Sequence, residues 1–252
     1  MVSPLALAVI VFGCVFGGAL LGMVLRDRLP KDHLGPETKD LVKLGVGLIG
    51  TMSALVLGLL VASAKGSYDT QRGELIQMSA KVVILDRVLA HYGPEAKEAR
   101  DLLRRYVVGT LARMWPAEGS GSAQLTPTLS DGETFYEKVQ ALAPQNDAQR
   151  SLQAQALGLG MDLGQTRWLM FQQGDSSISV PLLVVVVFWL AIIFASFGLF
   201  AHPNGLAIGV LLISAASVSA AIFLILELNQ PFEGLIRISS GPLRSALANL
   251  GR

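Results

Sequence analysis

The chain has 252 residues, of which 52% are hydrophobic and only 15% are charged, and its mean hydropathy is +0.52. Soluble globular proteins carry about 25% charged residues, so this composition excludes a water-facing surface over most of the chain. Twenty basic residues against nineteen acidic ones leave a net charge of +1, which excludes bulk electrostatic attraction to nucleic acid. The single cysteine, Cys14, excludes an intramolecular disulfide and a cysteine-based zinc site. We interpret the chain as an integral membrane protein.

Four segments are apolar over the length that a helix needs to cross a bilayer core, which is about 20 residues. The first two spans are predicted at residues 4–25 and 44–64, and the other two at residues 178–201 and 206–226. The stretch before the first span lacks a basic region, so we expect this span to be retained rather than cleaved. The turn at residues 202–205 is short and contains proline and glycine, which predicts a tight hairpin between the last two spans.

Residues 65–177 have the composition of a soluble protein and predict a helical extramembrane domain. We expect the helix of the second span to run on past Lys65, because no proline or turn cluster interrupts the chain there. A glycine and a proline follow Tyr92, where this helix is predicted to end. Farther on, Asn146 is predicted to cap a last long helix before the third span.

The remaining residues, 227–252, form a C-terminal tail. The predicted fold is therefore an all-α integral membrane protein in which two plus two transmembrane helices flank a helical extramembrane domain.

The second span carries two stripes of different character when it is drawn as a helix. Small residues and one lysine share a stripe about 80° wide, and bulky residues lie opposite. Small residues allow close helix packing in membranes, which is one interpretation of their stripe. The alternative is that one of the two stripes lines a pore around the axis of an oligomer. The small stripe comprises Gly47, Thr51, Ala54, Gly58, Ala62 and Lys65, and the bulky stripe comprises Leu48, Met52, Leu55, Val56 and Leu59.

Two further groups of charged residues stand at the ends of the spans. A ring of Lys65 side chains at a pore mouth would attract anions, and the neighbouring Asp69 would partly cancel that field. Glu227, at the end of the fourth span, is a candidate for a gate or an ion path, with ordinary solvation at the membrane interface as the alternative.

The sequence contains a signal for helix packing but none for catalysis. The first span contains Gly18-x3-Gly22, a spacing typical of close helix–helix contact. No nucleophile–base arrangement, phosphate-binding loop or pair of catalytic carboxylates is evident, and the three histidines lie far apart along the chain. We therefore expect no enzymatic activity, no metal site and no cofactor.

Two stretches together carry a family resemblance. One ends the second span and reads Leu57-Gly-Leu-Leu-Val-Ala-Ser-Ala-Lys-Gly-Ser-Tyr68-Asp69-x2-Arg72, and the other follows the fourth span with Pro231-Phe232-Glu-Gly234-Leu-Ile-Arg237. With two spans on each side of a helical insert, these stretches resemble the bacterial bestrophin-like membrane proteins, a family of unknown function. Many members have an acidic residue followed by alanine where this chain has Met78-Ser79, so the chain resembles a divergent subgroup.

The family name implies a distant similarity to bestrophins, which are homopentameric anion channels with four spans per subunit and a cytosolic helical domain. In those channels, apolar side chains of the second span form the narrow neck. The resemblance thus implies Leu48, Met52, Leu55 or Leu59 as neck residues, which conflicts with a pore lined by the small stripe. It also implies a cytoplasmic central domain and cytoplasmic termini in a bacterial inner membrane, whereas the distribution of basic residues does not decide the orientation.

The preferred hypothesis is a homo-oligomeric ion channel or channel-like protein, a pentamer by analogy, with an axial pore beside the second span and no selectivity assigned. Its partners would be lipid, further copies of the chain and permeating inorganic ions, with no nucleic acid. The alternative is a non-conducting membrane scaffold or sensor whose helical domain binds a partner. We interpret the Pro231-Phe232 motif as structural: it would end the fourth helix and pack its aromatic ring against the helices that leave the second and third spans. Gly234 would permit the following turn, ahead of Arg237.

Overall fold

The structure, a computed structural model, describes residues 3–30, 35–116, 123, 126, 129–174 and 180–251, without the side chains of 129–131 and 174. All regular secondary structure in these residues is helical, which confirms the predicted all-α class. The chain forms two compact units, each built from segments distant in the sequence. Unit 1 comprises residues 1–66 and 177–229, and unit 2 comprises residues 67–176 and 230–252.

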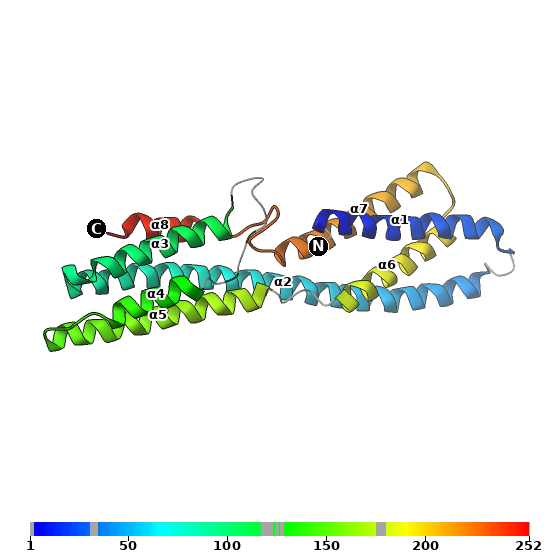
Figure 1. Cartoon of the computed structure of the whole chain (residues 1–252). Coiled ribbons are helices and arrows are strands. Elements are labelled where there is room, and N and C mark those ends of the chain that lie inside the picture. Colours follow the sequence, from blue (N-terminus) through cyan, green and yellow to red (C-terminus); the bar gives the residue numbers. More distant parts are fainter. Residues whose placement is uncertain are drawn as a thin grey trace. The chain divides into compact units, whose positions relative to one another are not determined.

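Four helices are long and apolar enough to cross a membrane, so the chain is an integral membrane protein. Residues 178 and 179, where the third span was predicted to begin, lie outside the described residues. The four membrane helices are α1 (Pro4–Arg28), α2 (Pro36–Tyr92), α6 (Val180–Phe200) and α7 (Gly205–Leu228) (Figure 1).

Polar groups at the ends of these helices satisfy backbone atoms that the helices leave unpaired. The hydroxyl of Ser3 accepts a hydrogen bond from the backbone N–H of Ala6 at the start of α1 (3.2 Å). At the other end of α1, the guanidinium of Arg26 donates to the carbonyl oxygen of Ala201, just after α6 (2.9 Å). Asn204 then caps α7 by accepting from the N–H of Ala207 (2.7 Å). The short connection between α6 and α7 is thus held by its own cap and by α1.

Close packing of α1 on α6 depends on small residues in both helices. A Cβ atom on Gly18 would stand 2.8 Å from the carbonyl oxygen of Ala191, and one on Gly22 would overlap the carbonyl of Ala195. Reciprocally, a Cβ atom on Gly198 would overlap the backbone of α1. The predicted contact through Gly18-x3-Gly22 is therefore confirmed, and its partner is α6.

The prediction of a tight hairpin between α6 and α7 is wrong in one respect. The turn is short, but the two helices diverge beyond it, and α1 is the helix that approaches both of them closely (Figure 1). The physical reason is that α1 has small residues on the face that meets α6, so α1 lies nearer to α6 than α7 does.

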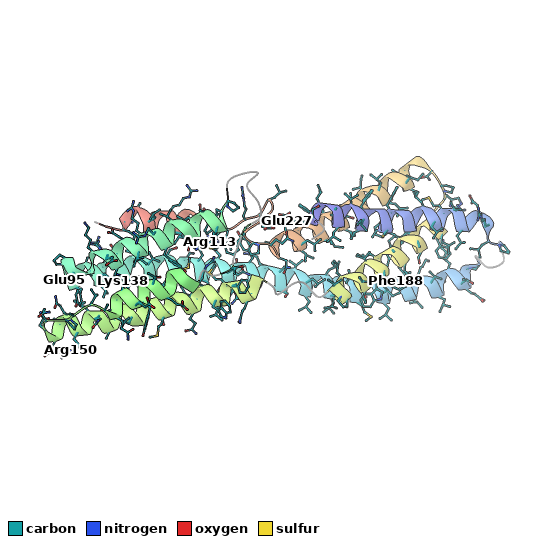
Figure 2. The ribbon with its side chains drawn as sticks, in the orientation of Figure 1. Glu95, Arg113, Lys138, Arg150, Phe188 and Glu227 are labelled. Carbon is teal, nitrogen blue, oxygen red and sulfur yellow. The ribbon has the colours of Figure 1, made fainter. Side chains whose placement is uncertain are left out.

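The core of unit 1 is formed by aliphatic side chains and Phe194. On the outside, large apolar side chains remain exposed, as expected for helices that lipid surrounds. Phe188 of α6 is an example, with 61% of its surface exposed (Figure 2). The buried residues of this core are Val11, Val15, Ala19, Met23, Leu60, Ala64, Val186, Leu190, Ile193, Phe194, Leu211, Ala215, Ile222 and Ile225.

Helix α2 is uninterrupted from Pro36 to Tyr92, so it contributes to both units. This confirms the prediction that the second span continues past Lys65 and ends at Tyr92. Gly93 follows with a φ of 132°, a conformation that side-chain-bearing residues rarely adopt. The side-chain amide of Gln149 donates to the carbonyl oxygen of Tyr92 (2.9 Å) and so satisfies the end of the helix.

Unit 2 packs the second part of α2 with the short 3₁₀ helix η2 (Pro94–Ala96) and with α3 (Lys97–Met114), α4 (Leu129–Gln140), α5 (Asp147–Gly174) and α8 (Gly241–Asn249). Asn146 caps α5, as predicted, by accepting from the N–H of Gln149 (2.8 Å). The amide of Gln153 donates to carbonyl oxygens at the end of α4, including that of Leu142 (2.8 Å). Side chains of α5 therefore close the ends of two neighbouring helices.

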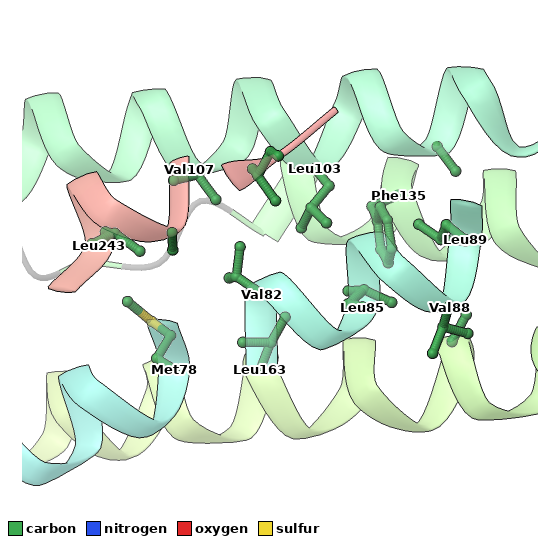
Figure 3. Close-up of a cluster of buried hydrophobic side chains, with 14 of the residues drawn as sticks. Met78, Val82, Leu85, Val88, Leu89, Leu103, Val107, Phe135, Leu163 and Leu243 are labelled. Atoms are coloured by element: carbon green, nitrogen blue, oxygen red, sulfur yellow. The ribbon is translucent and has the colours of Figure 1, made fainter. Parts of the chain in front are cut away.

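The core of unit 2 is shared among these helices. Leu85 and Leu89 come from α2, Leu103 from α3, Phe135 from α4 and Leu163 from α5, and they converge on one another (Figure 3). Apolar residues at steps of three and four along α2 build this core, as the helical periodicity predicts. All four of these helices contribute side chains to the core.

From residue 230 onward, the C-terminal tail belongs to unit 2 rather than standing apart, and it contains a helix, α8, that we did not predict. The first two residues of the predicted tail, Glu227 and Leu228, are instead the end of α7. Leu243 and Ala246 of α8 are buried in the common core. The backbone N–H of Gly251 then donates to Asp86 of α2 (3.2 Å). The tail is thus fixed to the bundle by apolar burial and by a hydrogen bond.

Candidate functional site

The part of α2 in unit 1 buries only one narrow face. Leu60 and Ala64 are buried in the core, while Val46, Ile49, Val56 and Leu57 pack against it in part. Only 11% of the apolar window of α2 is buried, compared with 28–33% for the windows of α1, α6 and α7. Within a single chain, α2 is therefore the most weakly covered of the four membrane helices.

Both stripes predicted on α2 lie outside this buried face. The bulky side chains are strongly exposed: Leu48 by 65%, Met52 by 45%, Leu55 by 74% and Leu59 by 62%. Val56, which we assigned to the same stripe, is half-buried and packs against the core of unit 1. Apart from Val56, the described residues leave both stripes exposed, so the small stripe is not a packing seam inside unit 1.

The small stripe is open and its one hydroxyl is already bonded. A Cβ atom on Gly47 or Gly58 would meet no other group within 4 Å, so another helix has room to approach closely there. The hydroxyl of Thr51 donates to the carbonyl oxygen of Gly47 one turn earlier (2.6 Å). This bond reduces the polarity that Thr51 presents outward.

The charged candidates differ sharply in exposure. Lys65 and Asp69 are exposed on α2, one on each side of the boundary between the segments of unit 1 and unit 2. Glu227 is only 4% exposed in the last turn of α7. A carboxylate that buried is not solvated by bulk water, so ordinary interfacial solvation does not describe it.

The Pro-Phe motif of the tail has a structural role in unit 2. Pro231 and Phe232 are buried after α7 ends at Leu228. The ring of Phe232 meets Trp115 edge-on, with ring centroids 5.8 Å apart. The aromatic partner is thus Trp115 at the end of α3, although we expected the helices that leave the second and third spans.

Hydrogen bonds and one glycine fix the rest of this motif. The indole N–H of Trp115 donates to the carbonyl oxygen of Ile238 (2.8 Å). The backbone N–H of Ile238 donates in turn to the carbonyl oxygen of Pro231 (2.6 Å). Gly234 lies between them with a φ of 75°, which confirms the predicted turn. Arg237 is exposed. The motif therefore closes a loop onto α3.

Ser53 and Arg167 are among the buried polar residues that the sequence pattern missed. Ser53 on α2 is 2% exposed, and its hydroxyl has no hydrogen-bond partner among the described residues. Arg167 on α5 is 1% exposed. A signal for Arg167 did exist, because it falls on the buried face of α5 between Leu163 and Met170 at helical spacing. Among the described residues, no cluster of three or more histidine, cysteine or acidic side chains is arranged to hold a metal ion.

Comparison with known families matches the chain to the model described as the Bestrophin-like domain, over residues 13–243. The chain belongs to the bestrophin-like family. The match covers α1 from residue 13 onward, the whole of α2, α6 and α7, and unit 2 up to the first turn of α8. Comparison with curated proteins gives no match, and comparison with solved structures gives none either. Membership of the bestrophin-like family agrees with the resemblance carried by the end of the second span and by the Pro-Phe motif.

Proposed function

We propose that this bestrophin-like protein is a homo-oligomeric ion channel, or channel-like protein, with an axial pore beside α2. The observation that carries the proposal is the weak coverage of α2, which leaves two contrasting stripes exposed along its membrane span. Lipid covers an apolar helix surface well, but it gives no reason for small residues to share one stripe. Packing against a neighbouring copy does, because small residues let helix backbones approach.

In a symmetric oligomer, one stripe faces the axis while the other contacts a neighbouring copy or lipid. If the small stripe packs on the neighbouring copy, the bulky side chains Leu48, Met52, Leu55 and Leu59 face the axis and form an apolar constriction, which gates by dewetting. If the bulky stripe contacts the neighbouring copy or lipid instead, Thr51 faces the axis and Lys65 forms a cationic ring at one mouth. Asp69 then reduces the attraction of that ring for anions.

The proposal includes further features carried over from the family. The protein lies in a bacterial inner membrane with unit 2 and both termini in the cytoplasm, it is a pentamer by analogy, and it has no enzymatic activity. The permeating species are inorganic ions, with no selectivity assigned. A reporter fused after Arg252 tests the orientation: activity of a periplasm-specific reporter there would reverse it.

Conductance measurements on the purified protein in planar bilayers test the central claim. Leu55→Ala is expected to change single-channel conductance if the bulky stripe lines the pore, and Thr51→Leu is expected to reduce it if the small stripe does. Phe188→Ala on α6, which removes another strongly exposed apolar side chain, is the control and should leave conductance unchanged.

Two outcomes would overturn the proposal. A silent bilayer with oligomers intact by native mass spectrometry would favour the alternative, a non-conducting scaffold or sensor whose helical unit binds a partner. A strict monomer in the membrane would remove the axial pore altogether.

A further inference from the structure

Unit 1 contains a groove of about 650 Å³ between the beginning of α2 and the end of α6 (Figure 1). Its apolar walls come from both helices, with Val46 on α2 and Phe197 on α6 as examples. Gly47 and Gly50 of α2 line the groove as well, and a Cβ atom on either glycine would meet nothing within 4 Å. The groove is therefore open and apolar along most of its length.

Two exposed lysines of α2, Lys39 and Lys43, line the same groove. Nζ of Lys43 lies 3.1 Å from Oδ1 of Asp40, but these side chains are 63% and 71% exposed, so the pair is weak and leaves further ammonium donors available. None of the described residues that line the groove is acidic. The hydroxyl of Ser196 donates to the carbonyl oxygen of Ile192 (2.9 Å). The donors that the groove offers to an anion therefore come from the two lysines.

The position of the groove along α2 indicates which molecule fills it. Lys43 directly precedes the apolar stretch predicted to cross the membrane, residues 44–64, so the lysines lie at the level of the lipid headgroups. From Lys43 to Gly50 the helix rises about 11 Å, whereas one leaflet of the roughly 30 Å hydrocarbon core is about 15 Å deep. The apolar part of the groove therefore stays within one leaflet, as the acyl chain of a phospholipid does.

The charge beside the groove favours an anionic headgroup. Arg26 of α1 donates to the carbonyl oxygen of Ala201 (2.9 Å), and Ala201 lines the groove. A third cation thus lies next to the groove wall. Basic pockets between membrane helices bind anionic headgroups, and each cation near the membrane surface adds to this attraction. A zwitterionic headgroup gains less, because its own ammonium cancels the charge of its phosphate.

We propose that this groove binds one anionic phospholipid, whose phosphate contacts Lys39 and Lys43 and whose acyl chain packs along Gly47 and Gly50 toward Phe197. The site goes beyond ion conduction, because lipid binding here requires no pore. Of these five residues, only Gly47 belongs to the small stripe of α2. A neighbouring copy packed on that stripe therefore lies beside the lipid and leaves the rest of the groove to it.

The test uses the full chain purified in detergent, and native mass spectrometry counts the lipid molecules bound per chain. The probes are palmitoyl-oleoyl phosphatidylglycerol and palmitoyl-oleoyl phosphatidylcholine, which have the same acyl chains and differ in headgroup charge. We expect saturable binding of one phosphatidylglycerol per chain, at least tenfold tighter than binding of phosphatidylcholine. Equal affinities for the two lipids would overturn the proposal.

Charge variants test the two lysines. Lys39→Gln and Lys43→Gln should each reduce the preference for phosphatidylglycerol about fivefold, as expected for one cation near an anionic headgroup, and the double variant should remove it. Arg28→Gln is the matched control, because it removes an exposed cation at the end of α1 that does not line the groove. Arg28→Gln should keep the preference. An equal loss in Arg28→Gln would mean that net charge attracts the lipid, and would overturn the proposal.

A pair of glycine variants tests the apolar part of the groove. Gly50 lines the groove with open space around it, so Gly50→Leu should fill the groove and weaken binding of phosphatidylglycerol at least tenfold. Gly45, on the same helix and equally unobstructed, does not line the groove, so Gly45→Leu should bind like the parent. Unchanged binding in Gly50→Leu, or oligomers that bind no phosphatidylglycerol because a neighbouring copy fills the groove, would overturn the proposal and leave the proposed function standing.

Discussion

The guanidinium of Arg100 on α3 donates two hydrogen bonds to the carboxylate of Asp86 on α2, with Nε–Oδ1 and Nη2–Oδ2 distances of 2.8 and 2.9 Å. The side chain of Asp86 is 3% exposed and that of Arg100 is 24% exposed. The same carboxylate accepts from the backbone N–H of Gly251, beyond α8. The buried carboxylate of Asp86 on α2 therefore connects this helix to α3 and to the residues after α8.

Removing this carboxylate should destabilise unit 2. Asp86→Asn leaves Arg100 without its charged partner, and breaking such a pair costs about 2–3 kcal/mol when one partner is partly exposed. Hydrogen exchange of the full chain in detergent should then speed up at least tenfold in α8 and in the first turns of α3. Asp147→Asn is the control: Asp147 pairs with Arg150 on an exposed surface, with a side chain 95% exposed, and its loss should change exchange little. Equal effects of the two variants would contradict this role of Asp86.

Acid should remove the same stabilisation. Burial alone would raise the pKa of Asp86, but the hydrogen bonds from Arg100 and Gly251, together with the positive charges of Arg100 and Arg87, outweigh burial and lower this pKa. Because the folded-state pKa lies below the unfolded value of about 3.9, the carboxylate stabilises the fold fully above about pH 4. This stabilisation is lost as the pH falls through the folded-state pKa.

Thermal unfolding followed by circular dichroism at several pH values measures this effect. The midpoint of the parent should exceed that of Asp86→Asn at pH 6, and the difference should shrink steadily below about pH 4. A difference that stays constant down to pH 2.5 would mean that the charge of Asp86 does not contribute.

The contact between α1 and α6 predicts opposite outcomes for two glycines of the same helix. A Cβ atom on Gly22 would overlap the backbone of α6 at Ala195, whereas one on Gly13 would meet nothing within 4 Å. Gly22→Ala should therefore push the helices apart and cost about 1–3 kcal/mol, while Gly13→Ala should be neutral. The fraction of folded protein in a sodium dodecyl sulfate titration measures both. Equal midpoints for the two variants would argue against the close contact.

Replacing either of two glycines of unit 2 by alanine should change the stability of the fold, in opposite directions. Gly234 has a φ of 75°, so Gly234→Ala is strained and should cost about 1 kcal/mol. Gly73 lies within α2, and a Cβ atom there would meet nothing within 4 Å, so Gly73→Ala should stabilise the helix by up to about 1 kcal/mol. Thermal unfolding midpoints should shift down for the first variant and up for the second. A downward shift for both would mean that contacts, rather than backbone conformation, dominate.

Local signals in the sequence account for much of the fold. The absence of a proline or turn cluster near Lys65 predicted that α2 would continue past this residue, and the Gly-Pro pair predicted its end at Tyr92. Both predictions depend on neighbouring residues alone. Helix α8 was missed although it begins with Gly241-Pro242 and continues with Leu243 and Ala246 at helical spacing. Its signal is short, and its burial depends on α3, far away in the chain.

The candidate sites were less predictable because they depend on what surrounds a residue in space. Hydropathy marks α2 as a span but does not tell a stripe that faces lipid from one that faces another copy, and the single chain covers neither Thr51 nor Leu55. For Arg167, the periodicity of α5 predicts a buried position, yet its hydrogen-bond partner Met114 comes from α3. Only packing in three dimensions brings these two side chains together.

The two stripes of α2 make a last prediction about water. Ala54 and Leu55 are adjacent and both exposed, but they lie on opposite stripes, so an axial pore wets only one of them. Cys14, the sole cysteine, is itself exposed, so each new cysteine is introduced into a Cys14→Ser background. In proteoliposomes, a charged, membrane-impermeant methanethiosulfonate should modify either Ala54→Cys or Leu55→Cys, because a thiol in hydrocarbon does not form the reactive thiolate. Leu60→Cys, at 5% exposure in the core, should stay unmodified, and Lys43→Cys should react. If Lys43→Cys reacts while both test cysteines stay silent, no water-filled path lies beside α2.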